Sequence, residues 1–137
     1  MDFRGAQVKN MMRVASMSDY IRCDMAYLVL NDQIQSNWGN QISSWGYQRP
    51  STEFWADAIA EVKKSYNVQF LAEVYDPWTE PLQNVGFDFT YNKGLYDRLG
   101  NGNLDDIRGY ISGTPPSYFF KSAHCMYSPN VRFDLIS

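Results

Sequence analysis

The chain has 137 residues, with 12 basic and 15 acidic side chains and a formal net charge of −3. This length suits one domain, and the charge excludes a nucleic-acid-binding protein that relies on a basic surface. No apolar run approaches the ~18 residues of a membrane span, and no charged segment followed by an apolar one opens the chain, so neither a membrane helix nor a secretory signal is visible. Cys23 and Cys125 lack disulfide-framework or metal-ligand spacing, and we expect both to be reduced and buried.

Helices and strands are predicted to alternate from the start of the chain. Residues 6–16 carry apolar side chains at spacings of three and four, which predicts an amphipathic helix. The first half of residues 20–30 predicts a short strand. Residues 31–50 are rich in Asn, Gln, Ser and Gly. They predict a long loop, of the kind that is functional or disordered in compact domains.

The second helix and the second strand carry the clearest patterns. A hydroxyl and an acidic residue within residues 50–53 favour a helix start there. Apolar residues then follow at spacings of 4, 3 and 4: Trp55, Ile59, Val62 and Tyr66. Residues 68–75 form a nearly continuous apolar run that ends near a carboxylate. Such a run is typical of a strand that is buried on both faces of a parallel sheet.

The rest of the chain continues the alternation. A third strand, two helices and a last short strand are expected at residues 86–91, 93–99, 104–112 and 123–127. Asn103 is the expected N-cap of the last helix, and Gly113 lies just past its end. Alternation at this spacing indicates βαβ units and an α/β fold with right-handed crossovers.

Three charged residues lie where α/β enzymes place catalytic groups. Arg22 and Asp24 share one face of the first strand because side chains two apart point the same way. Asp24 and Glu73 each follow a strand, and parallel strands meet at one edge. The guanidinium would keep Asp24 ionised, while Glu73, among apolar neighbours, would keep its proton more readily. This division suits retaining glycoside hydrolysis. The alternative is a structural Arg22–Asp24 ion pair and an unrelated Glu73.

At these residues the sequence resembles a known family. The segment Ile-Arg-Cys-Asp-Met-Ala at 21–26 is similar to the fourth-strand motif of the α-amylase family, glycoside hydrolase family 13. The segment Phe-Leu-Ala-Glu-Val-Tyr at 70–75 is similar to its fifth-strand motif. Residues 53–59 and 86–96 are similar to the flanking helix and the sixth strand of bacterial members. The resemblance implies an incomplete (β/α)8 barrel of the TIM type, roughly strands four to seven, spanning residues 1–137.

The resemblance also implies a role for each residue. Asp24 would be the nucleophile, Arg22 its neighbouring arginine and Glu73 the general acid/base of an enzyme of carbohydrate metabolism. Its substrate would be an α-glucan oligosaccharide or polysaccharide. The reaction would be hydrolysis or transglycosylation. Four residues past the strand ends would contact the sugar: Tyr27, Tyr75, Asp76 and Trp78. Packing is the alternative for Tyr27 and Trp78, and a turn role before Pro77 is the alternative for Asp76.

Several features depart from the family pattern. The family's third catalytic carboxylate should follow Ala123-His124, but the chain continues with Cys-Met-Tyr, and Asp134 lies too far along to replace it. We therefore expect His124 to be structural and the chain to be part of a longer enzyme, inactive alone, with a change of reading frame near residue 125 as one explanation. Tyr20 also replaces the small residue that usually precedes the Ile-Arg pair in the family's fourth-strand motif. No cofactor is implied, and a structural calcium belongs only to the complete enzyme.

A partial barrel leaves strand edges and apolar faces uncovered, so we expect the chain alone to be poorly stable, or to pair with itself or with a partner. The alternative function is a non-catalytic amylase-like interaction or carbohydrate-binding module. A nucleotide-binding domain is disfavoured because no Gly-rich loop follows a strand.

Overall fold

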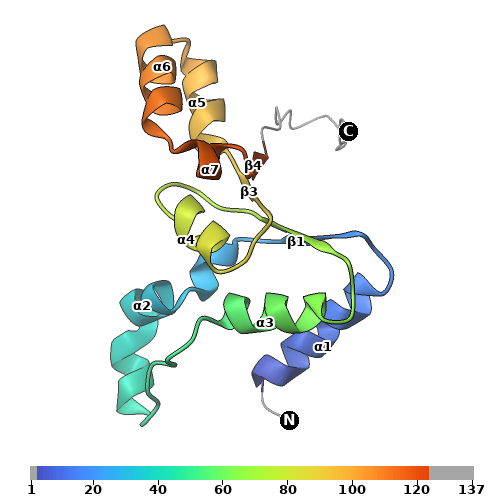
Figure 1. Cartoon of the computed structure of the whole chain (residues 1–137). Helices are drawn as coiled ribbons and strands as arrows, with labels where there is room; N and C mark the ends of the chain where they lie inside the picture. Colours follow the sequence, from blue (N-terminus) through green and yellow to red (C-terminus); the bar gives the residue numbers. More distant parts are fainter. Residues whose placement is uncertain (1–2, 124–137) are drawn as a thin grey trace.

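The computed structural model describes residues 3–123, which form a four-stranded parallel sheet with helices (Figure 1). The strands pair in chain order, β1-β2-β3-β4. Their bounds are Tyr20–Cys23 for β1, Gln69–Ala72 for β2, Phe89–Tyr91 for β3 and Ser122–Ala123 for β4. The predicted α/β class and the parallel pairing are therefore confirmed. The strands at 68–75 and 86–91 are shorter than expected.

The predicted helices are confirmed with small shifts of their ends. The helical segments are α1 Phe3–Ala15, the 3-10 turn η1 Ala26–Val29, α2 Asn31–Ser44, α3 Phe54–Lys63, α4 Thr79–Asn84, α5 Lys93–Asn101, α6 Leu104–Gly113 and α7 Pro116–Phe119. Asn103 is the N-cap of α6, and its side chain accepts from the backbone N–H groups of Asp105 and Asp106. The segments η1, α4 and α7 were not predicted because they are too short to show a helical period.

The predicted loop at residues 31–50 is wrong for its first two thirds, which form α2. The start of this helix is stabilised from a distance. The backbone N–H of Asn31 donates to Glu53 Oε2 at 3.0 Å, and its side-chain amide donates to the carbonyl of Thr52 at 3.0 Å. A carboxylate at a helix N-terminus is favourable. Because the Glu53 carboxylate lies 22 residues further along the chain, the composition of residues 31–50 does not indicate this helix start.

The sheet buries one face, not both. On this face Ile21, Cys23, Phe70 and Ala72 are buried against α1, α3 and α4. On the other face, Leu71, Phe89 and Tyr91 are half-buried, and Tyr20 and Arg22 are exposed. The prediction that the second strand is buried on both faces is therefore wrong. Its apolar run continues past the strand into Val74, which is also buried.

Cys23 is a free, buried thiol, as the sequence predicted. Burial raises its pKa to about 12, and Arg22 partly opposes that rise. The thiol therefore stays protonated at neutral pH and behaves as a small apolar core residue. Cys125, His124 and the end of the last predicted strand lie outside the described residues.

The helices divide into two groups in space. Figure 1 shows α1 and α3 side by side below the sheet, while α5 and α6 form a hairpin that projects away from them. Gly102, which joins α5 to α6, has φ 68°, a left-handed conformation that glycine adopts at little cost. Within residues 3–123, no helix combines the length and apolarity needed to cross a membrane.

Candidate functional site

The strand register places Asp24 and Glu73 at the same edge of the sheet. Cys23 pairs with Ala72 at the ends of β1 and β2. The next residues on the two strands are Asp24 and Glu73, and the N–H of Glu73 donates to the carbonyl of Cys23 at 2.9 Å. Parallel strands thus bring both carboxylates to the carboxyl edge, as predicted from their positions after each strand.

The Arg22 guanidinium joins the two carboxylates. Its Nη1 donates to Asp24 Oδ1, and its Nη2 donates to Glu73 Oε2 at 2.8 Å. Its Nε donates to the hydroxyl of Tyr91 at 3.4 Å, and Cζ lies 5.7 Å from the centre of the Tyr91 ring. Glu73 is therefore part of the same cluster as the Arg22–Asp24 pair. The chemical roles of the three residues stay predictions.

The two carboxyl groups have different surroundings. The side chain of Asp24 is 73% exposed, whereas that of Glu73 is 15% exposed. Hydrogen bonding with the Glu73 carboxyl and with Arg22 holds the pKa of Asp24 below its ordinary value. Asp24 therefore stays ionised into mildly acidic solution, which is the state that a nucleophile requires.

We predict that Arg22→Leu raises the pKa of Asp24, because the charged donor that favours its ionised form is removed. In the native chain, the Arg22–Asp24 interaction stabilises the folded state at pH values above the ordinary Asp pKa of 3.8. This stabilisation is lost as the pH falls through the lower pKa that Asp24 has in the folded chain. Titration of the Asp24 carboxyl by ¹³C NMR measures the change. Arg49→Leu, which removes the separate Arg49–Asp32 ion pair, is the control, and an identical Asp24 titration in Arg22→Leu would contradict the prediction.

Glu73 has two further donors. The backbone N–H of Met25 donates to Oε2 at 3.1 Å, and the hydroxyl of Tyr75 donates to Oε1 at 3.3 Å. Oε2 thus accepts from both Met25 and Arg22, whereas Oε1 accepts only the longer bond from Tyr75 among these contacts.

Three aromatic side chains form a group that contacts Glu73 through Tyr75. Tyr27 stacks on Trp78, with ring centres 6.5 Å apart and planes 13° from parallel. The edge of Tyr75 meets Tyr27, with ring centres 6.4 Å apart. Tyr27 and Trp78 are half-buried against the core, which is the packing role kept open above, whereas Tyr75 is exposed. Sugar contact by these rings stays a prediction.

Asp76 lies in the turn that follows β2. Its peptide bond to Pro77 is cis, and its Oδ1 accepts from the hydroxyl of Thr79 at 3.4 Å. The turn position and the bond from Thr79 fit the turn role that the sequence left open. Contact between Asp76 and a sugar stays a prediction.

Two members of the cluster, Tyr91 and Met25, were not predicted. Tyr91 could have been found, because it lies two residues after Phe89 on β3 and therefore shares the face of Arg22. Met25 acts through its backbone N–H, so its side-chain type gave no signal.

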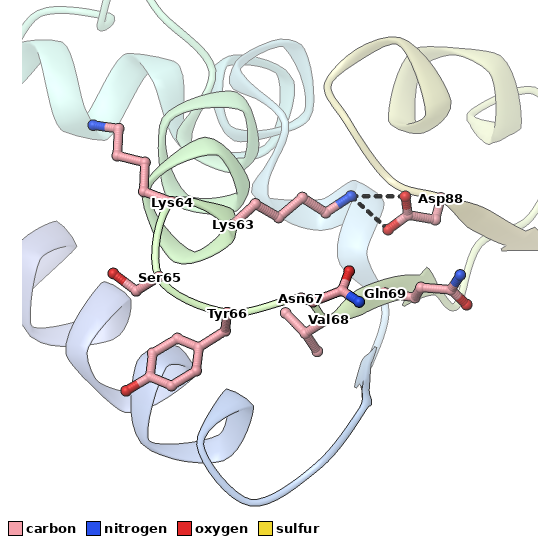
Figure 2. Close-up of a pocket in the computed structure, with 8 residues that line it drawn as sticks. All are labelled: Lys63, Lys64, Ser65, Tyr66, Asn67, Val68, Gln69 and Asp88. Carbon is pink, nitrogen blue, oxygen red and sulfur yellow. Dashed lines mark hydrogen bonds and ion pairs between the residues drawn. The ribbon is translucent and has the colours of Figure 1, made fainter.

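The groove of about 470 Å³ shown in Figure 2 lies at the opposite, amino edge of the sheet. Lys63 points toward Asp88 and donates to both of its carboxylate oxygens at 2.7 Å, whereas Lys64 points away. Asp88 Oδ2 also accepts from the N–H of Phe70 at 2.8 Å. Because the Lys63 charge is neutralised within the chain, this groove offers little for a ligand. The candidate site is the carboxyl edge.

Among residues 3–123, no group of three or more His, Cys, Asp or Glu side chains could hold a metal ion.

Comparison of the chain with protein-family models, with curated protein sequences and with solved structures gave no significant match. The family resemblance thus rests on the motifs around Asp24 and Glu73 and on the similar segments at residues 53–59 and 86–96.

Proposed function

We propose that the chain is part of a retaining glycoside hydrolase or transglycosylase that acts on α-glucans, and that its sheet is a segment of a (β/α)8 barrel. The observation that carries the proposal is the cluster in which Arg22 bridges Asp24 and Glu73 at the carboxyl edge of a parallel sheet. Two carboxylates in such a position are the minimum for a double displacement at a glycosidic carbon.

The proposed chemistry has two steps. Asp24 attacks the anomeric carbon while the bond from that carbon to the leaving oxygen breaks, and Glu73 gives the leaving oxygen its proton. Glu73 then takes a proton from a water or a sugar hydroxyl, whose oxygen attacks the same carbon and releases Asp24. The lowered pKa of Asp24 supports its role as the ionised partner.

Binding of maltoheptaose to the chain, followed by ¹⁵N NMR, tests the substrate class. We expect maltoheptaose to shift the amide signals of Tyr27, Tyr75 and Trp78, the aromatic group that contacts Glu73 through Tyr75. We expect no shifts from cellohexaose at the same concentration. Equal responses to both sugars, or none to either, would contradict the proposal.

A non-catalytic carbohydrate-binding module is the second candidate, and the stacked Tyr27–Trp78 pair favours it. Covalent labelling separates the two functions. With a 5-fluoro-α-glucosyl fluoride, an enzyme containing this chain should form a glycosyl ester at Asp24 that mass spectrometry locates. Sugar binding without that ester would favour the binding module.

We also predict that the chain associates with itself. On the face of the sheet opposite the core, Tyr20 is 52% exposed, and Leu71, Phe89 and Tyr91 are only half-buried. Within residues 3–123, β1 pairs only with β2, so one of its edges is open to another strand. Sedimentation velocity over a range of concentrations should show dimers or larger species. A monomer at every concentration, with cooperative thermal unfolding and no binding of a hydrophobic dye, would contradict this.

A further inference from the structure

Met25 has an unusual backbone conformation directly after the proposed nucleophile. Its φ of 43° and ψ of 44° place it in the left-handed region. Across residues 3–123 it is the only residue other than glycine with a positive φ. Methionine avoids this region because its Cβ crowds the following carbonyl, and such strain persists only where the surroundings impose it.

The surroundings of Met25 hold this turn from two sides. The N–H of Ala26 donates to the carbonyl of Glu73 at 3.0 Å. The indole N–H of Trp55, from α3, donates to the carbonyl of Ala26 at 2.8 Å in a buried contact. Ala26 itself is fully buried. The turn between β1 and η1 is therefore fixed both to β2 and to the core helix.

The strained conformation has a direct result at Glu73. It directs the N–H of Met25 to Oε2 of the Glu73 carboxyl, at 3.1 Å. The same oxygen accepts from Arg22 Nη2 at 2.8 Å. Two donors on Oε2 fix the orientation of the carboxyl plane. Oε1 accepts only the longer bond from the Tyr75 hydroxyl, at 3.3 Å, and is therefore the oxygen better placed to carry a proton.

We infer that Met25 is a positioning residue, whose left-handed backbone aims its N–H at Oε2 so that Oε1 of Glu73 is the atom that exchanges the proton with the substrate. This inference rests on the proposed function only for the role of Glu73. The hydrogen bond and the strained turn stand without it.

The first test measures the contact without any turnover. In the chain, Glu73→Gln should change the ¹H shift of the residue-25 amide, because the oxygen that accepts from this N–H belongs to a carboxyl group in the native chain and to an amide in the variant. Glu80→Gln, at an exposed position on α4, should leave that signal in place. An amide at residue 25 that does not respond to Glu73→Gln would overturn the inference while leaving the proposed function intact.

The second test compares two substitutions of Met25. Asparagine visits the left-handed region readily, whereas β-branched valine does so at high cost. We expect Met25→Asn to keep the amide response to Glu73→Gln and Met25→Val to lose it. In an enzyme containing this chain, Met25→Val should lower kcat on unactivated glucans by about 10²-fold, with little change for α-glucosyl fluoride, and Met25→Asn should restore it.

The outcomes separate the two proposals. Equal kcat values for Met25→Val and Met25→Asn would overturn the positioning role. An amide response in an enzyme that neither binds nor cleaves α-glucans would instead reject the proposed function, and with it the role of Oε1 in proton transfer.

Discussion

Glu73→Gln is expected to lower kcat on unactivated α-glucans by about 10²- to 10⁴-fold in an enzyme containing this chain, which is the usual contribution of a general acid. The amide has nearly the shape of the carboxyl group and can still meet Arg22, so binding should change little. It has no acidic proton for the leaving oxygen. Steady-state kinetics on maltoheptaose measures the loss.

The leaving group provides the control within the same variant. Fluoride departs without a proton, so Glu73→Gln should retain rapid release of fluoride from α-glucosyl fluoride. Asp24→Asn should lose activity on both substrates because the covalent step itself is removed. Glu80→Gln, on the exposed side of α4, should behave as the native enzyme. Normal turnover of maltoheptaose in both Glu73→Gln and Asp24→Asn would refute the assignment.

Trp55→Ala is expected to lower the free energy of unfolding by about 3–5 kcal/mol, as large-to-small changes of buried aromatics do. Trp55 is buried in α3, and its ring packs edge-on against Phe87, with ring centres 5.0 Å apart. Urea denaturation of the chain measures the loss. Trp45→Ala is the matched control, because Trp45 is 68% exposed, and it should change the stability by less than about 0.5 kcal/mol.

Trp55→Phe separates packing from hydrogen bonding at the same position. The phenyl ring keeps most of the contact area, but it cannot donate to the carbonyl of Ala26 as the indole N–H does at 2.8 Å. A buried carbonyl without a donor costs about 1–3 kcal/mol. A variant as stable as the native chain would show that the bond contributes nothing, and equal stabilities of Trp55→Ala and Trp45→Ala would refute the packing role.

The parallel sheet and the meeting of Arg22, Asp24 and Glu73 follow from simple rules. Side chains alternate along a strand, and parallel strands end at one edge. These rules use only residues within a few positions of each other, and the second strand carries a strong apolar pattern. They were sufficient to place Asp24 and Glu73 at one edge of the sheet and Arg22 on the same strand face as Asp24.

Features that depend on distant contacts could not be predicted in this way. The first residue of helix α2, Asn31, donates its N–H to the Glu53 carboxylate, and no local sequence pattern predicts that contact. The contacts of Arg22 also differ from expectation. The sequence paired its guanidinium with Asp24, whereas in the structure it donates to Glu73 as well. The length of the arginine side chain lets it reach a neighbouring strand, which a rule about spacing within one strand does not include.

The Lys63–Asp88 ion pair at the amino edge has a consequence for how this fold can diverge. Asp88 also accepts from the backbone of β2, so a single carboxylate links α3 to two neighbouring strands. All of this lies at the end of the strands opposite Asp24 and Glu73. Because this anchor lies at the amino end of the strands, the loops at the carboxyl end can change while the framework persists. Changes in these loops can then alter specificity without a change in the framework.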